Sequence, residues 1–192
     1  MNEQVIEILT EEASMEYFLR GFLPRVLPED YKLDVNCFIR PHEGKSDLKK
    51  SIPKKMRAYP HFGYPVKDLI VHDQDSNDCM ELKQSLMALT QTSIHNIPLL
   101  VRIACRELEN WYLGDFISLE NVYLEINAGL LSRKAKFRNP DNVFGAQEIS
   151  LLSDSFSKTA AARAMGSIIN VDSNASPSFR QFVNGLLNIV DN

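Results

Sequence analysis

Residues 67–78 read KDLIVHDQDSND, a short apolar run that ends in an acidic loop. The LIV triplet at 69–71 has the apolar, β-branched composition of a short buried strand. The segment that follows, 75–91, places apolar side chains on one face at helical spacing. We therefore expect a strand, an acidic turn and a helix in succession, the unit from which parallel sheets are built.

The same order recurs on both sides of this stretch. Apolar runs at 5–9, 33–39 and 98–104 indicate further strands, each followed by a segment with helical spacing. Most of these runs are apolar without alternation, which is typical of strands covered on both faces. The sequence therefore predicts an α/β fold with a mainly parallel sheet and helices on both faces. The expected helices after these runs lie at 15–26, 46–57 and 106–113.

The last third of the sequence has a different pattern. From about residue 118 no segment has the pattern of a strand, and two helices are expected, at 157–169 and 178–190. A chain of 192 residues is long enough for one sizeable core and short for two. We expect an α/β core at 1–117 and a helical C-terminal extension at 118–192 that packs on it.

Composition excludes several classes of protein. Hydrophobic residues make up 44% of the chain and charged residues 24%, which excludes disordered, collagenous and coiled-coil proteins. The three cysteines, Cys37, Cys79 and Cys105, are widely spaced and form no CxxC pair. Neither a disulfide framework nor a thiolate zinc site is therefore expected.

The sequence also argues against a membrane protein and against export. The longest apolar stretch, 97–105, is interrupted by Arg102 and is far shorter than the roughly 20 residues that a membrane span needs. The N-terminus carries Glu3 and Glu7 and lacks the basic start of a signal peptide. We expect a cytoplasmic protein.

Pairs of acidic residues follow three of the expected strands. In an open parallel sheet, ligands bind beyond the carboxyl ends of the strands, so acidic residues at several of these ends point to a site. The pairs are Glu11 with Glu12 after the first strand, Asp73 with Asp75 after the third, and Glu107 with Glu109 after the fourth.

Asp73 and Asp75 are the centre of a metal-site hypothesis. If the backbone stays extended, their side chains project to the same side and repel each other unless a cation lies between them. Carboxylate oxygens suit Mg²⁺ or Mn²⁺. The alternative is that such residues cap the next helix, which we prefer for Asp78. For Asp73 and Asp75 the two interpretations are balanced, and Glu11 at a neighbouring strand end favours the metal.

The fourth strand contributes at most one carboxylate. Glu107 and Glu109 lie two positions apart in an expected helix, so their side chains point in different directions. We expect Glu107, which is nearer the strand end, to join the site. For Glu109, a surface position as partner of Arg106 or Arg102 is an equally good interpretation.

Two basic segments flank the acidic positions. Such segments fit phosphate groups, although a solvated lysine-rich helix is an equally good interpretation. Lys45 follows Gly44, whose small size allows an anion to approach the backbone, but the Walker A spacing is absent. The segments contain Lys45, Lys49, Lys50, Lys54, Lys55 and Arg57, and then Arg133, Lys134, Lys136 and Arg138 with Phe137 available to stack on a base.

Six stretches of the chain resemble an uncharacterised bacterial family of Toprim-related proteins, domain of unknown function 4276, which is distantly similar to OLD-type nucleases. Members are often encoded beside an AAA-type ATPase, so the resemblance implies such a partner and a role in phage defence or repair. The stretches span nearly the whole chain, and CRELENWYLGD is the most specific. They are ILTEEASMEYFLRGFLP (8–24), GKSDL (44–48), HDQDSNDC (72–79), RIACRELENWYLGD (102–115), KTAAARAMG (158–166) and SPSFRQFVNGL (176–186).

The resemblance also implies a Toprim-like core and a set of metal ligands. Toprim domains place a glutamate after the first strand and a DxD motif after the third around one or two Mg²⁺ ions. Carried over by position, these are Glu11, Asp73 and Asp75. The wider group commonly has Glu-Gly where this chain has Glu11-Glu12, so Glu12 is the alternative ligand.

Together these patterns predict a nuclease that hydrolyses phosphodiester bonds with Mg²⁺ or Mn²⁺. Glu11, Asp73 and Asp75 would hold the ion with Glu107 nearby, and Lys45 would stabilise the transition state. The alternative is a binding subunit of an ATPase-containing complex whose Toprim-like site has lost catalysis. The sequence does not specify DNA or RNA, or the oligomeric state.

Overall fold

The structure, a computed structural model, describes residues 4–92 and 96–191. Within these residues, four strands form one sheet in the order β2-β1-β3-β4, and every neighbouring pair is parallel. The α/β class and the parallel sheet predicted from the sequence are therefore confirmed, and the architecture is consistent with a Toprim-like fold. The strands are β1 (Val5–Thr10), β2 (Cys37–Pro41), β3 (Val66–Asp73) and β4 (Leu99–Ala104).

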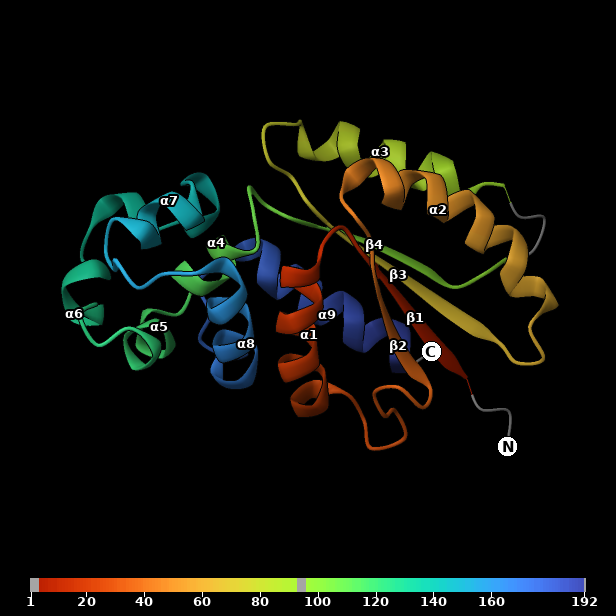
Figure 1. Ribbon diagram of the computed structural model, residues 1–192, viewed down its shortest axis with the longest axis horizontal. Coiled ribbons are helices and arrows are strands. Elements are labelled where there is room, and N and C mark those ends of the chain that lie inside the picture. The colour runs from red at the N-terminus through yellow and green to blue at the C-terminus, as the bar shows by residue number, and fades with distance from the viewer. Residues whose placement is uncertain (1–3, 93–95, 192) are drawn as a thin grey trace.

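Long helices cover both faces of the sheet (Figure 1). On one face α1 (Ala13–Val26) packs with α8 (Lys158–Ile168) and α9 (Pro177–Asp191), and the latter lies along β4. On the other face lie α2 (Lys45–Ala58) and α3 (Cys79–Thr90). Each face of the sheet is therefore buried, as the apolar composition of the strands requires.

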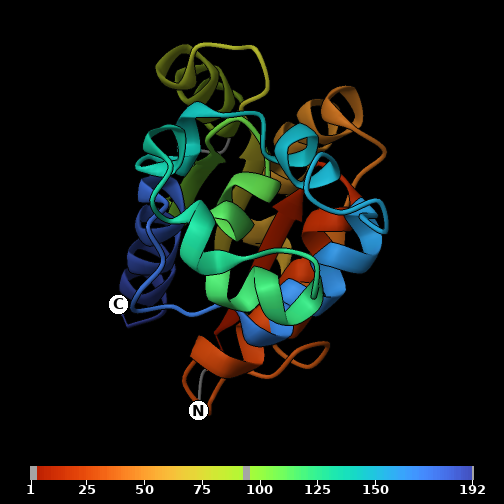
Figure 2. The ribbon, with the colours of Figure 1, turned by 90° about the vertical axis from the view of Figure 1, so that its left-hand side faces the viewer.

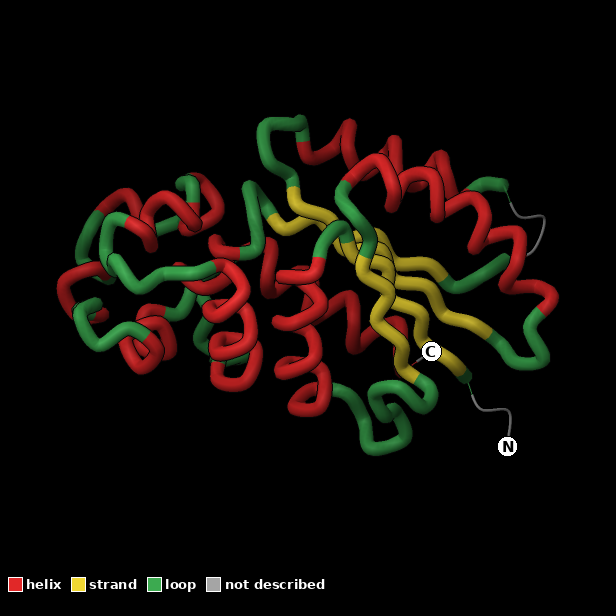
Figure 3. The backbone as a smooth tube through the Cα atoms, viewed as in Figure 1, coloured by secondary structure: helices red, strands yellow, loops and turns green. Residues whose placement is uncertain are grey.

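Short helices form a separate layer beyond β4, seen end-on in Figure 2 and at one end of the tube in Figure 3. The sequence did not predict α5 to α7, because helices this short carry too few turns to show a periodicity. The short helices of this group are α4 (Glu109–Leu113), α5 (Phe116–Val122), α6 (Ala128–Leu131) and α7 (Gly145–Ser150), with 3₁₀ turns at Ala135–Phe137 and Pro140–Asn142. A further 3₁₀ turn, Tyr59–His61, follows α2.

The second strand begins later than the sequence predicted. Residues 33–36 alternate like a strand but form a turn, in which Asp34 has a φ of 60° and the Asn36 side chain accepts a hydrogen bond from the Lys32 amide at 2.8 Å. The turn chemistry of Asp and Asn prevails over the alternating pattern, because both side chains favour turns and left-handed backbone conformations. β2 therefore starts at Cys37 rather than at residue 33.

The apolar interior has one cluster on each face of the sheet. The larger joins α1 to α4, α8 and α9 and centres on Trp111, Phe18 and Phe182. The smaller joins α2 and α3 to the sheet. The division at residue 117 stays a prediction; it falls inside α5, and the larger cluster draws residues from both sides of it.

None of the helices in the described ranges is long and apolar enough to span a bilayer. The longest apolar stretch of the sequence, 97–105, forms β4 and the residues that directly flank it.

Candidate functional site

The acidic residues lie at the topological switch point of the sheet, between β1 and β3. From β1 the chain passes through α1 to β2 on one side, whereas from β3 it passes through α3 to β4 on the other. Such a switch point opens a crevice at the carboxyl ends of the two central strands. Thr10 pairs with Val71 in the ladder, so the residues that follow β1 and the end of β3 lie at the same edge.

Asp73, the last residue of β3, is the centre of this cluster. Its Oδ1 is shielded from solvent and has no hydrogen-bond partner among the residues that the structure describes. Burial raises the pKa of Asp73 well above its usual value, and surrounding carboxylates raise it further. In order of effect these carboxylates belong to Glu109, Glu11, Glu12 and Asp75.

Glu11 contacts the buried side chain of His72. The Oε2 atom of Glu11 lies 3.0 Å from Nδ1 of His72, and the same nitrogen lies 2.6 Å from the carbonyl oxygen of Asp73. Burial raises the pKa of Glu11 to about 7, although Lys45 opposes the shift, and burial lowers the pKa of His72. Burial favours a neutral His72, whose Nδ1 donates to the carbonyl oxygen of Asp73, and Oε2 of Glu11 has no hydrogen-bond partner among the described residues.

Asp75 is presented by a strained turn. Its φ is 52°, a left-handed conformation, and its amide donates to the carbonyl oxygen of Arg106 at 2.6 Å. Its carboxylate forms an ion pair with Lys45, the first residue of α2. The hydrogen bond to Asp75 raises the pKa of Lys45, so its ammonium stays charged at the edge of the cluster. Lys45 therefore lies beside Asp75 at the carboxyl end of β3.

In the structure it is Glu109, and not Glu107, that is buried beside Asp73. Glu109 is 1% exposed, and burial raises its pKa to about 7. Glu107, expected to join the site, points toward α7, where it accepts a hydrogen bond from the Ala146 amide at 2.8 Å and pairs with Lys158 at 3.2 Å. The surface interpretation of Glu109 was wrong, and Glu107 acts as an anchor for α7.

The helix register explains this difference. α4 begins at Glu109, so Tyr112 and Leu113 share its face at positions i+3 and i+4. Both are fully buried, and the hydroxyl of Tyr112 also lacks a partner in the described chain. In the sequence, the position of Glu109 three and four residues before these large apolar side chains was the signal that could have indicated its burial.

Glu12 lies close enough to the cluster to affect its charge. It precedes α1, is exposed, and accepts a hydrogen bond from the Ser14 hydroxyl at 2.7 Å. Its charge contributes to the raised pKa values of both Asp73 and Glu109. The structure thus brings both Glu11 and Glu12 near Asp73.

The first basic segment forms most of α2, and its cations fall into those with acidic partners and those that are exposed. Lys45 faces Asp75, and Lys55 lies 3.5 Å from the buried Glu7, so both have acidic partners within the fold. Lys49 is close enough to the site to help lower the pKa of His72. The remaining exposed cations are Lys50, Lys54 and Arg57.

The second basic segment lies beside α7. Lys136 pairs with Glu148 at 2.6 Å, while Arg133, Lys134 and Arg138 are exposed. Phe137, expected to be available for stacking, is 4% exposed and packs edge-on against Phe116. That expectation was wrong, because the 3₁₀ turn at Ala135–Phe137 directs the ring inward.

The chemistry of the cluster fits a hard cation. Carboxylate oxygens on Asp73 and Glu109 are shielded and lack donors within the described ranges, a costly arrangement unless a proton or a metal ion compensates it. In residues 4–92 and 96–191, however, no three His, Cys, Asp or Glu side chains converge closely enough to form a ligand set as they stand. Binding would therefore draw these side chains inward.

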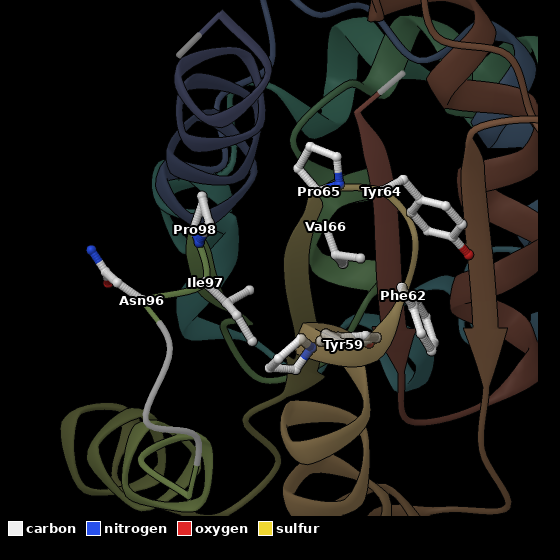
Figure 4. Close-up of a pocket in the computed structure, with 9 residues that line it drawn as sticks. Tyr59, Phe62, Tyr64, Pro65, Val66, Asn96, Ile97 and Pro98 are labelled. Atoms are coloured by element: carbon white, nitrogen blue, oxygen red, sulfur yellow. The ribbon is translucent and has the colours of Figure 1, made fainter. Parts of the chain in front are cut away.

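A separate hollow of about 240 Å³ lies at the opposite, amino-terminal edge of the sheet (Figure 4). Phe62 and Tyr64 line it on one side, and Ile97 and Pro98, just before β4, on the other. Its lining is apolar and aromatic apart from Asn96. It lacks the carboxylates and cations of the strand-end cluster.

Comparison with known proteins gives one match. The family model described as "Domain of unknown function (DUF4276)" matches residues 10–187, which include the acidic cluster and both basic segments. No curated protein and no solved structure matches the chain.

Proposed function

Because this chain belongs to the DUF4276 family, whose description assigns no activity, we propose from the site itself that it is a Mg²⁺- or Mn²⁺-dependent phosphodiesterase acting on nucleic acid. The observation that carries the proposal is Asp73, whose buried Oδ1 has no hydrogen-bond donor in the described residues and whose charged form is disfavoured by burial and by repulsion from the surrounding carboxylates. A divalent cation bound there would relieve this repulsion.

The residues have distinct parts in this proposal. Glu11 or Glu12, with Asp73 and Asp75, would hold the ion, and Glu109 takes the place expected for Glu107. When bound, such an ion polarises a phosphoryl oxygen and lowers the pKa of a coordinated water. His72 lies against Glu11 at the edge of the site, while Lys45 would offset charge on the phosphate in the transition state.

The basic residues support nucleic acid as the substrate. The chain has a formal net charge of −4, so attraction for a phosphate backbone must come from local patches. Lys45 and Lys49 lie at the site on α2, and three exposed cations continue that helix. Arg133, Lys134 and Arg138 are exposed in the segment that precedes α7 in the chain. These patches would hold the strand on either side of the acidic cluster.

A cleavage assay tests the proposal. End-labelled single- and double-stranded DNA and RNA are incubated with the protein in Mn²⁺, in Mg²⁺ and in EDTA. We expect Asp73→Asn to lose at least about 100-fold in rate, as is typical when a group that binds the transition state is removed. Cleavage by Asp73→Asn at the wild-type rate would reject the assignment.

Asp78→Asn is the matched control. Asp78 lies five residues further on and accepts hydrogen bonds from the amides of Met80 and Glu81 as the N-cap of α3. Asparagine caps a helix as well as aspartate does, so this variant removes the same charge nearby without removing a proposed ligand. It should cleave at close to the wild-type rate.

A second candidate is a catalytically inactive subunit that binds an AAA-type ATPase in a defence complex. The observation in its favour is the ion pair of Lys45 with Asp75, since an ammonium group there competes for the position that a metal would take. This candidate predicts copurification with the ATPase and no cleavage of any nucleic acid in Mn²⁺. Lys45→Ala would then gain Mn²⁺ affinity without gaining cleavage.

A further inference from the structure

An exposed aromatic side chain lies beside the acidic cluster and is covered on one side by an arginine. Phe144, which precedes α7, is 55% exposed. The guanidinium carbon of Arg106 lies 5.1 Å from the centre of its ring. This distance is within the range of a cation–π contact. Together the two side chains form a planar, cationic and partly apolar surface.

The Arg106 half of this surface is tied to the loop that carries the proposed ligands. Arg106 adopts a left-handed conformation with a φ of 61°. Its carbonyl oxygen accepts the amide of Asp75 at 2.6 Å, and its own amide donates to the Gln74 side chain at 3.0 Å. Any movement of Arg106 would therefore be coupled to Asp75.

The Phe144 half is held by the residue next to Glu109. The buried amide side chain of Asn110 donates to the carbonyl oxygens of Pro140 at 2.6 Å and Val143 at 2.8 Å, and accepts from the Gly145 amide at 3.3 Å. A Cβ atom at Gly145 would come within 2.6 Å of the Asn110 backbone. The residues on both sides of Phe144 are thus fixed, which removes an ordering cost from anything that binds to the ring.

We propose that Arg106 and Phe144 form a stacking platform for an unpaired nucleobase of the substrate. Aromatic rings and guanidinium groups stack on bases of any sequence, and the phosphates flanking such a base would meet the cations of α2 and of residues 133–138. This inference rests on the proposed function for the identity of the substrate. It assigns a preference for single-stranded or unpaired nucleic acid, which the acidic cluster does not specify.

Binding measured without cleavage tests the platform. The probe is a single-stranded DNA decamer containing 2-aminopurine, compared with a decamer of abasic sites, in EDTA and again in Ca²⁺. We expect Phe144→Ala to weaken binding of the base-containing decamer by about 5- to 100-fold, the range reported for loss of one stacking contact. Binding of the abasic decamer should not change.

Two further variants separate stacking from folding. Phe144→Trp should retain affinity and the quenching of 2-aminopurine, because a larger aromatic ring still stacks. Leu151→Ala, at the other end of α7, removes a 75% exposed apolar side chain and should change neither probe. Equal loss of both probes in Phe144→Ala, or no loss in either, would overturn the platform.

The outcomes distinguish this inference from the proposed function. Base-dependent binding without cleavage in Mn²⁺ would reject the phosphodiesterase and keep the platform. Cleavage at the wild-type rate and KM by Phe144→Ala on single-stranded substrate would reject the platform and keep the phosphodiesterase.

Discussion

The same two strands carry two groups of buried carboxylates, and the groups differ in how their charge is balanced. Midway along the sheet, Glu7 of β1 pairs in the ladder with Asp68 of β3. Glu7 is the balanced member of this pair, because it accepts two hydrogen bonds from Arg40 at 3.0 Å each and has Lys55 at 3.5 Å. Asp68 accepts one hydrogen bond from the Tyr59 hydroxyl at 3.0 Å, and its Oδ2 has no partner among the described residues. At the strand ends, Asp73 has no such donor within the described residues.

The difference teaches that burial of a carboxylate does not by itself identify a functional site. Glu7 is as buried as many core residues, yet neighbouring elements supply its partners, so it has a structural role. Asp73 and Glu109 are surrounded by other acids, with Lys45 and Lys158 at the edge of the group. Uncompensated charge in a crevice is the feature that marks a site.

The largest effect on stability is expected in the balanced group. Glu7→Gln should lower the free energy of unfolding by about 3 kcal/mol, because it breaks charge-assisted hydrogen bonds and leaves Arg40 and Lys55 without their acid. Urea unfolding at pH 7.5 measures this. The rate of any Mn²⁺-dependent cleavage per folded molecule should stay unchanged. Full stability in this variant would show that the pairing with Arg40 is not structural.

Adding Mn²⁺ should raise the free energy of unfolding through the carboxylates around Asp73. At a Mn²⁺ concentration 100 times its Kd, the wild-type protein should gain about 2.7 kcal/mol of stability, since the ion binds the folded state. Glu7→Gln should gain the same amount, and Asp73→Asn should gain little. Thermal unfolding with and without Mn²⁺ measures these gains. An equal gain in Asp73→Asn would place the ion elsewhere.

Asp68 gives a pH-dependent test in the middle of the sheet. Burial raises its pKa to about 7, partly opposed by the hydrogen bond from Tyr59 and the charge of Lys55. Between about pH 4 and pH 7 the unfolded carboxyl ionises while the native one keeps its proton, so this group's contribution to stability is lost as pH rises. From pH 5 to pH 7.5, the wild type should lose on the order of 2 kcal/mol more than Asp68→Asn.

Unfolding curves at several pH values in EDTA measure this difference. Asparagine retains an acceptor for the Tyr59 hydroxyl, so the variant isolates the charge. Parallel pH profiles for the two proteins would show that Asp68 titrates in the native state as it does in the unfolded chain.

The smallest effect separates the two glutamates after β4. Glu107→Ala should cost about 1 kcal/mol, because it removes the acceptor for the Ala146 amide that anchors α7. Glu109→Gln in EDTA should not lower stability, since it removes a carboxylate whose charged form burial disfavours more than Lys158 favours it. Urea unfolding of both variants measures the contrast. A larger loss of stability in Glu109→Gln than in Glu107→Ala would show that Glu109 has the structural role and that Glu107 does not.

Local patterns predicted most of the fold. The stripe from Met15 to Val26 and the apolar run before Asp73 have a clear periodicity, and their helix and strand formed where expected. The prediction failed at residues 33–36, where turn chemistry overrode alternation, and at the short helices α5 to α7. Both cases lack the repeated spacing on which such reasoning depends.

The candidate site was predicted in part. Acidic residues at strand ends drew attention to Glu11, Asp73 and Asp75, because parallel topology brings such ends together. The same reasoning chose Glu107 over Glu109, and the second basic segment suggested Phe137 as a stacking residue. In both cases the direction of the side chain was set by packing against distant segments, α7 for Glu107 and Phe116 for Phe137.

By itself, the sequence determined the α/β class, the parallel strands and the set of acids and bases at their ends, since periodicity and composition are local properties. The tertiary structure alone decided which charges are compensated. Arg40 reaches Glu7 across 33 positions of the chain, whereas Asp73 meets Glu109 and Glu11 instead of a cation. Electrostatic energy depends on distances in space and on exclusion of water, and neither can be read from the order of residues.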